Sequence, residues 1–64
     1  MTETKVYKLH DSIHVEAFTT SLGTEGIRHM VFEYEEYTAI EVTGTPLEII
    51  RASTIYQQVT TIEL

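Results

Sequence analysis

The chain has 64 residues, of which ten are acidic and four are lysine or arginine, so its formal net charge is −6 at pH 7. This length predicts a single small domain spanning residues 1–64, and such a domain buries only about 60% of the surface of its unfolded chain. The acidic balance argues against direct binding to nucleic acid or anionic lipid, because both need surfaces rich in lysine and arginine.

Two further classes of protein are disfavoured by composition. No apolar run approaches the roughly 20 residues of a membrane span, and MTETKVYK lacks the apolar core of a signal peptide, so we expect a cytoplasmic protein without membrane contact. The sequence has no cysteine, which removes disulfides and the usual zinc spacings, and we expect neither metal nor cofactor. A thin core is often supplemented by self-association, so a homodimer is also expected.

Residues 4–20 are predicted to form a β-hairpin. The first strand begins with Val6, Tyr7 and Leu9. The second strand alternates Ile13, Val15, Ala17 and Thr19 with His14, Glu16 and Phe18. Asp11-Ser12 is the predicted turn, because both side chains can bond nearby backbone, and it would pair His10 with Ile13 and Leu9 with His14. Residues 20–26 (TSLGTEG) are then read as a loop without a phosphate-binding motif.

The stretch between Gly26 and Gly44 is predicted to be strand. At period two its even positions are apolar or β-compatible, namely Met30, Phe32, Tyr34, Thr38, Ile40 and Val42. A helical stripe through Ile27, Met30, Val31, Tyr34 and Tyr37, with Thr24 as cap, is the alternative. The β-branched and aromatic content favours strand. The stretch is longer than a usual strand, so we expect a break near Glu35-Glu36. The break would give either one strongly bent strand or two strands joined by a bulge. A tight two-residue hairpin is disfavoured, because it would need positive φ at both glutamates.

A helix is predicted after Gly44. Thr45 is the expected cap, Pro46 the first helical residue and Glu48 the partner of Thr45 in a capping box. The apolar stripe consists of Ile49, Ala52, Ile55, Tyr56, Val59 and Ile62. The alternative is a short helix over 46–53 followed by a strand over 54–63, because this end is rich in β-branched residues.

These elements predict an α+β fold in which a small antiparallel sheet of three to four strands packs against a C-terminal helix. The alternative C-terminal strand would produce a five-stranded architecture with a helical turn before the last strand. That arrangement resembles an SH3-like small barrel in topology.

The only cluster of reactive side chains in the sequence is HDSIH at residues 10–14. Neighbouring residues on a strand or tight turn point apart, so this cluster does not predict a hydrolytic triad. His10 and His14 would fall on opposite faces of the predicted hairpin, and only a helical conformation or a third ligand such as His29 would restore a metal site. Glu33 and Glu35 would share a strand face at about 7 Å, a glycosidase-like separation, but so short a chain rarely builds the cleft. We therefore expect no enzymatic activity.

The candidate binding residues lie in the central acidic and aromatic stretch, which has no basic residue between Arg28 and Arg51. They are Glu33, Tyr34, Glu35, Glu36, Tyr37 and Glu41. A row of carboxylates with tyrosines predicts docking on a basic protein surface, with inhibition of a nucleic-acid site as one form of this function. The alternative is a structural, self-associating protein in which the sheet edge or the helix stripe forms a symmetric interface and the charge provides solubility.

Overall fold

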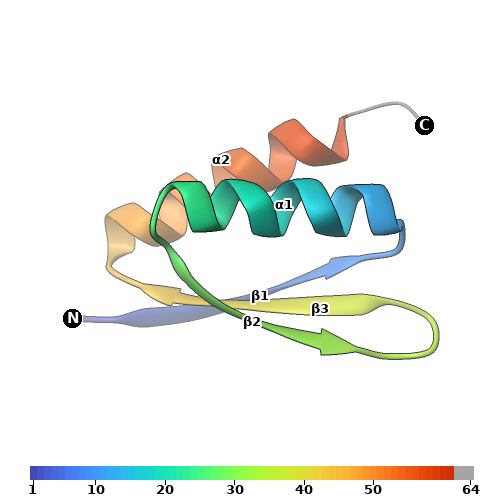
Figure 1. Ribbon diagram of the computed structural model, residues 1–64. Helices are drawn as coiled ribbons and strands as arrows, with labels where there is room; N and C mark the ends of the chain where they lie inside the picture. The colour runs from blue at the N-terminus through green and yellow to red at the C-terminus, as the bar shows by residue number, and fades with distance from the viewer. Residues whose placement is uncertain (62–64) are drawn as a thin grey trace.

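A computed structural model describes residues 1–61 of the chain. Its elements are β1 (Glu3–Leu9), α1 (Ser12–Thr24), β2 (Arg28–Glu33), β3 (Thr38–Gly44) and α2 (Pro46–Thr60). The three strands form one antiparallel sheet in the order β1-β3-β2, and both helices cover the same face of it (Figure 1). The predicted α+β class with a C-terminal helix is confirmed. The five-stranded alternative is wrong, because α2 is helical as far as Thr60.

The central strand of the sheet is β3, which pairs antiparallel with β1 on one side and β2 on the other. β1 and β2 therefore run parallel to each other, and α1 is the crossover between them. At the middle of the sheet Ile40 lies opposite Tyr7 on β1 and Val31 on β2. The predicted pairing of β1 with residues 13–19 is wrong, because the partner of β1 is β3.

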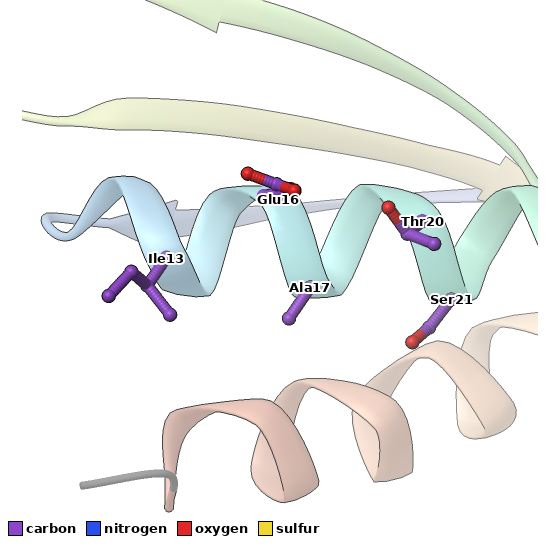
Figure 2. A pocket seen from close by; sticks show the side chains of 5 residues that line it. All are labelled: Ile13, Glu16, Ala17, Thr20 and Ser21. Carbon is purple, nitrogen blue, oxygen red and sulfur yellow. The ribbon is translucent and has the colours of Figure 1, made fainter. Parts of the chain in front are cut away.

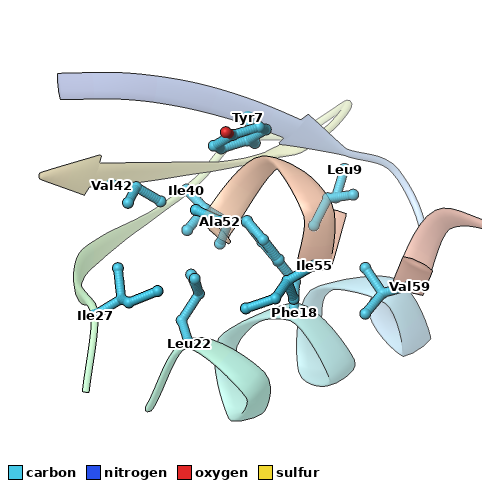
Figure 3. Packing of buried hydrophobic residues seen from close by; sticks show 10 residues of the cluster. All are labelled: Tyr7, Leu9, Phe18, Leu22, Ile27, Ile40, Val42, Ala52, Ile55 and Val59. Atoms are coloured by element: carbon cyan, nitrogen blue, oxygen red, sulfur yellow. The ribbon is translucent and has the colours of Figure 1, made fainter. Parts of the chain in front are cut away.

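The hydrophobic core lies between the sheet and the two helices (Figure 3). Its buried residues are Tyr7, Leu9, Phe18, Leu22, Ile27, Ile40, Val42, Ala52, Ile55 and Val59. The ring of Tyr7 meets that of Phe18 edge to face, with ring centroids 5.2 Å apart. The buried core thus draws on β1, α1, β3, α2 and Ile27, and β2 contributes no buried side chain to it.

The predicted second strand at residues 13–19 is wrong, because this segment is helix α1. A strand would have placed Phe18 on the polar side, whereas Phe18 is fully buried. Phe18 and Leu22 are four residues apart, so a helix points both toward the sheet and buries both completely. The alternation of Ile13 and Val15 with polar residues fits a strand locally, but Ile13 stays exposed. A strand would also bury Glu16 and Thr20 with Phe18 and Leu22, whereas the helix leaves Glu16 and Thr20 exposed.

Helix α1 ends in a Schellman motif at Gly26, inside the stretch that was predicted to be a loop. Gly26 has a φ of +70°, its N–H donates to the carbonyl of Gly23, and the N–H of Ile27 donates to that of Leu22. The buried side chains of Leu22 and Ile27 belong to the same motif. The loop prediction is therefore wrong for the helical residues up to Thr24 and correct only for the short turn that follows.

The predicted strand between Gly26 and Gly44 is two strands, and the break falls near Glu35-Glu36 as expected. The chain reverses there, however, so the expectation of a bent or bulged strand is wrong. Tyr34 N–H donates to the carbonyl of Tyr37 at 2.9 Å, which closes a four-residue connection. Within residues 1–61 only a glycine has positive φ, so Glu35 and Glu36 both keep negative φ. The chain therefore reverses without a type I′ turn, which would need positive φ at both glutamates.

The capping box of α2 is confirmed. Thr45 Oγ1 accepts from the N–H of Glu48, and the Glu48 carboxylate accepts from the N–H of Thr45. Ala52, Ile55 and Val59 are buried as predicted, with Ile49 and Tyr56 packed beside them. The predicted member Ile62 lies outside the described residues. The alternative strand is wrong over residues 54–60, because helix packing against the core overrides the weak helix propensity of β-branched residues.

Candidate functional site

The sheet face opposite the helices, here called the open face, is left uncovered by both of them (Figure 1). Directly opposed residues in an antiparallel sheet share a face. The register therefore places Val6, Glu41 and Met30 in one row across the open face, and Lys8, Ala39 and Phe32 in the next row. Tyr34 continues the line of Met30 and Phe32 beyond the end of β2.

Three side chains of β2 and its continuation make this face apolar. Met30, Phe32 and Tyr34 are exposed by 56%, 38% and 57%, and Val6 on β1 is exposed by 52%. We call these four residues the apolar patch. Ala39 lies between Lys8 and Phe32 and is buried by them. Several large apolar side chains exposed on one uncovered sheet face are typical of a contact surface for another protein.

The period-two expectation for this region is therefore wrong in one respect. Along a single strand, Met30 and Phe32 would share a face with Ile40 and Val42. The hairpin pairs Met30 with Glu41 and Val31 with Ile40, so Met30 and Phe32 fall on the open face while Ile40 and Val42 point into the core. The alternation in the sequence puts all four on one face, and no local signal separates them.

The connection between β2 and β3, residues 34–37, is called the hairpin end. The rings of Tyr34 and Tyr37 lie against each other with centroids 5.1 Å apart. Lys8 Nζ lies 5.0 Å from the centroid of the Tyr37 ring, a cation–π contact. His10 Nδ1 is 3.2 Å from the carbonyl oxygen of Glu36 and donates to it, since a carbonyl only accepts. Residues at the end of β1 therefore hold the hairpin end in place.

The six predicted binding residues separate into three locations. Tyr34, Glu35, Glu36 and Tyr37 form the hairpin end and are brought together. Glu41 lies at the centre of the open face, opposite Val6 and Met30. Glu33 pairs with Thr38 and shares the helix-covered face with it, so the structure separates Glu33 from Glu41. The acids do not form the single row that alternation along one strand predicts.

The HDSIH cluster does not assemble around one point. His14 is on α1, where its Nδ1 lies 3.8 Å from the Asp11 carboxylate, whereas His10 precedes the helix and contacts the hairpin end. The sequence expectation placed these histidines on a hairpin, which is wrong. In the described part of the chain no three histidine or acidic side chains are grouped closely enough to hold a metal ion.

A second polar cluster, which sequence reasoning missed, joins β1 to α2. The Tyr7 hydroxyl is 2.7 Å from Ser53 Oγ, and Lys5 Nζ donates to the same oxygen at 3.3 Å. A serine beside a lysine is a known nucleophile arrangement when the lysine is a neutral base. Here the exposed Lys5 ammonium acts as donor to Ser53, so the contacts tether α2 to the sheet instead of activating the hydroxyl.

A surface depression of about 510 Å³ lies along α1. Ile13, Glu16, Ala17, Thr20 and Ser21 line it, and all five come from successive turns of one helix (Figure 2). Among residues 1–61, Glu16 is the only ionisable residue that lines it. One carboxylate beside small side chains supplies neither an acid–base pair nor a clamp for a charged ligand.

The fold and the site define a small two-layer α+β protein with one uncovered sheet face. Comparison of the chain with protein-family models, with curated proteins and with solved structures finds no match. Among residues 1–61 no helix is both long and apolar enough to cross a lipid bilayer.

Proposed function

We propose that this protein is a non-enzymatic binding protein that docks on a basic surface of another protein through its open face and hairpin end. The single observation that carries the proposal is the apolar patch beside the hairpin end, because its exposed methionine and aromatic side chains adjoin Glu35 and Glu36. Protein interfaces commonly combine aromatic and methionine side chains at the centre with charged groups at the rim.

The charge of the surface supports a basic partner. Glu41 lies within the open face, and Glu35 and Glu36 add two carboxylates at one end of it. Arg51 is paired with Glu25 elsewhere on the molecule, at 3.3 Å. Lys8 and Arg28 are the basic residues that the register places on the open face, and Lys8 contacts the Tyr37 ring. The three carboxylates of Glu35, Glu36 and Glu41 outnumber them. Complementary charge accelerates association and is screened by salt, so binding should weaken as ionic strength rises.

One form of this function is inhibition of a protein that binds nucleic acid. A basic surface that normally contacts phosphates would also accept carboxylates, and the tyrosines would contact its apolar parts. The expected location is the cytoplasm, because an acidic chain without cysteine fits a reducing compartment. Glu33 is outside the proposed docking surface because it lies on the other face of the sheet.

The test is affinity capture from lysate of the source cell with four versions of the protein. The baits are the wild type, the hairpin-end variant E35Q/E36Q, the open-face variant F32S and the control E16Q, which removes an exposed acid from α1. The proposal expects one protein with a basic surface that wild type and E16Q retain at low salt, that both site variants lose, and that elutes as salt rises. Equal recovery of the same proteins by all four baits would reject the proposal.

A structural, self-associating protein, for which a homodimer is the simplest form, is the second candidate function. The observation that favours it is the outer edge of β2, where Met30, Val31 and Phe32 are three consecutive exposed apolar residues. Light scattering of the purified protein distinguishes this candidate from docking, because it needs no other protein.

A further inference from the structure

The outer edge of β2 lacks several of the features that usually prevent strand pairing, and its charged residues Arg28 and Glu33 stand only at its two ends. β2 is an outer strand, and no other strand in residues 1–61 lies along its free side. Its sequence, RHMVFE, has no proline, glycine or lysine. Natural sheets commonly protect such edges with lysine, proline or a bulge, and β1 at the other side of the sheet carries Lys5 and Lys8. The edge of β2 is therefore available for pairing.

The backbone of β2 determines which residues would bond to a new strand. In an antiparallel ladder each residue directs both its N–H and its C=O to the same side, and successive residues alternate. Tyr34 bonds inward, toward Tyr37, so this alternation makes the even-numbered residues of β2 bond to β3. His29, Val31 and Glu33 consequently direct their donors and acceptors toward the free edge.

We propose that a second copy of this chain pairs antiparallel with this edge, with a two-fold axis through Val31, so that two three-stranded sheets become one six-stranded sheet. In this register the outward peptide groups of one Val31 face those of the other. His29 of each copy lies opposite Glu33 of the other, so these two residues also exchange backbone hydrogen bonds. The proposal rests on self-association, the second candidate function, for which it specifies the interface, and it does not depend on the docking function.

The side chains along this edge are complementary in the same register. On the helix-covered face, the imidazole of His29 lies opposite the Glu33 carboxylate of the second copy. His29 Nδ1 donates to the carbonyl of Ile27 at 2.9 Å, so Nε2 can donate to that carboxylate when the ring carries a second proton and is an imidazolium. Each copy thus offers a ring nitrogen where the other offers an acid.

On the open face the same register also matches unlike groups. Met30 lies opposite Phe32 of the second copy, which pairs two exposed apolar side chains. Arg28 lies opposite Tyr34, where a guanidinium meets an aromatic ring. Outside the Val31 axis each position therefore sets a group against one that attracts it: an imidazolium against a carboxylate, a methionine against a phenylalanine, and a guanidinium against an aromatic ring.

Other registers lose this complementarity. Moving the axis to Met30 would place the imidazole of His29 opposite Val31, and moving it to Phe32 would place the carboxylate of Glu33 opposite Val31. A shift by one residue would place an odd-numbered residue of one copy opposite an even-numbered residue of the other. The even-numbered residues direct their N–H and C=O groups toward β3, so the two edges could not form hydrogen bonds. The register centred on Val31 is the one that the edge favours.

A two-fold axis perpendicular to the sheet keeps both open faces on the same side. The two apolar patches then lie on one continuous face, and the hairpin end of each copy lies beside the start of β2 in the other. A dimer would thereby double the docking surface without covering it.

The first test uses a single cysteine, because the natural chain has none. In the proposed dimer the two Val31 Cα atoms are about 5.5 Å apart, within the range that a disulfide spans. V31C should therefore become a covalent dimer under mild oxidation. E33C is the matched control, since its two copies would lie about 13 Å apart. Equal or faster cross-linking of E33C would overturn the register.

The second test measures self-association of the protein without cross-linking. By sedimentation, the wild type should be dimeric, and V31K should raise the dimer dissociation constant at least tenfold because it places two ammonium groups at the axis. V6K, an exposed valine on β1, is the control that should remain dimeric. Circular dichroism checks that V31K is folded. A monomeric wild type, or a V31K dimer as tight as wild type, would overturn the proposal.

Charge exchange supplies a third test of the same pairing. H29E places two glutamates opposite each other and should weaken the dimer, whereas H29E/E33K restores opposite charges and should recover it. Failure of the double variant to recover any affinity, with V31C also failing to cross-link, would reject this edge as the interface. Capture of a basic partner by monomeric V31K would leave the docking function intact, so the two proposals fail independently.

Discussion

Glu33 and Glu41 lie on opposite faces of the sheet, although period-two alternation along one strand would place both on the same face. The reason is the hairpin, which pairs Glu33 with Thr38 and Met30 with Glu41. Ile40 and Val42 consequently face the helices, while Glu41 lies between Val6 and Met30 on the open face.

This separation predicts different effects of neutralising the two acids on docking. E41Q should weaken binding of the captured basic partner by about two- to fivefold, the effect of a modest charge interaction, because Glu41 lies in the docking surface. E33Q should leave that affinity unchanged. Titration of each variant at low and high salt measures the difference. Equal effects of E33Q and E41Q would contradict docking through the open face.

The two glycines at the end of α1 should respond to alanine with opposite signs. Gly23 is helical and a Cβ there would meet nothing within 4 Å, so G23A should raise the free energy of unfolding by about 0.4–1 kcal/mol. Gly26 has a φ of +70°, and G26A should lower the free energy of unfolding by about 1–2 kcal/mol. Urea unfolding measures both. A stabilising G26A would show that the Schellman turn is not formed.

The start of α2 predicts a coupled pair of substitutions. T45A removes the side-chain acceptor of the capping box and should cost about 1 kcal/mol of stability. G44A would place a Cβ 2.6 Å from Glu48 Oε1, so the carboxylate must move away from the Thr45 N–H. Because both substitutions break the same box, the double variant G44A/T45A should lose less stability than the two single losses added. Simple additivity in urea unfolding would argue against a shared box.

The ion pair between Glu25 and Arg51 predicts a pH effect on stability. A hydrogen bond from Arg51, together with its positive charge, holds the pKa of Glu25 below its ordinary value of 4.5. The folded state thus binds a proton at Glu25 less readily than the unfolded state. The stabilisation is present above about pH 4.5 and is lost as the pH falls through the lower folded value. R51Q should flatten the dependence of the melting temperature on pH in this acidic range, whereas R28Q, which leaves this pair intact, should not.

Local chemistry was sufficient to predict several elements of the fold. The Thr45–Pro46–Glu48 signal specifies the start of α2, because the cap, the pre-set φ and the reciprocal carboxylate all act within four residues. The β-branched and aromatic residues of 28–44 specify strand and a break at Glu35-Glu36. The α+β class and the gathering of Tyr34 and Tyr37 near these acids follow from the same local pattern.

Tertiary packing determined what local patterns left ambiguous. Residues 13–19 alternate well enough for a strand, but a strand would place Phe18 and Leu22 on the same face as Glu16 and Thr20. Only a helix buries Phe18 and Leu22 while Glu16 and Thr20 stay exposed. The direction of the chain after Tyr34 decides which face each residue of β2 and β3 occupies, and this direction depends on long-range pairing of β3 with β1. The sequence by itself therefore determined that residues 46 onward begin a helix and that residues 28–44 form strands with a break near Glu35-Glu36. Only the tertiary structure decided which apolar residues form the core and which form the open face and the free edge, because burial depends on neighbours that are distant in sequence.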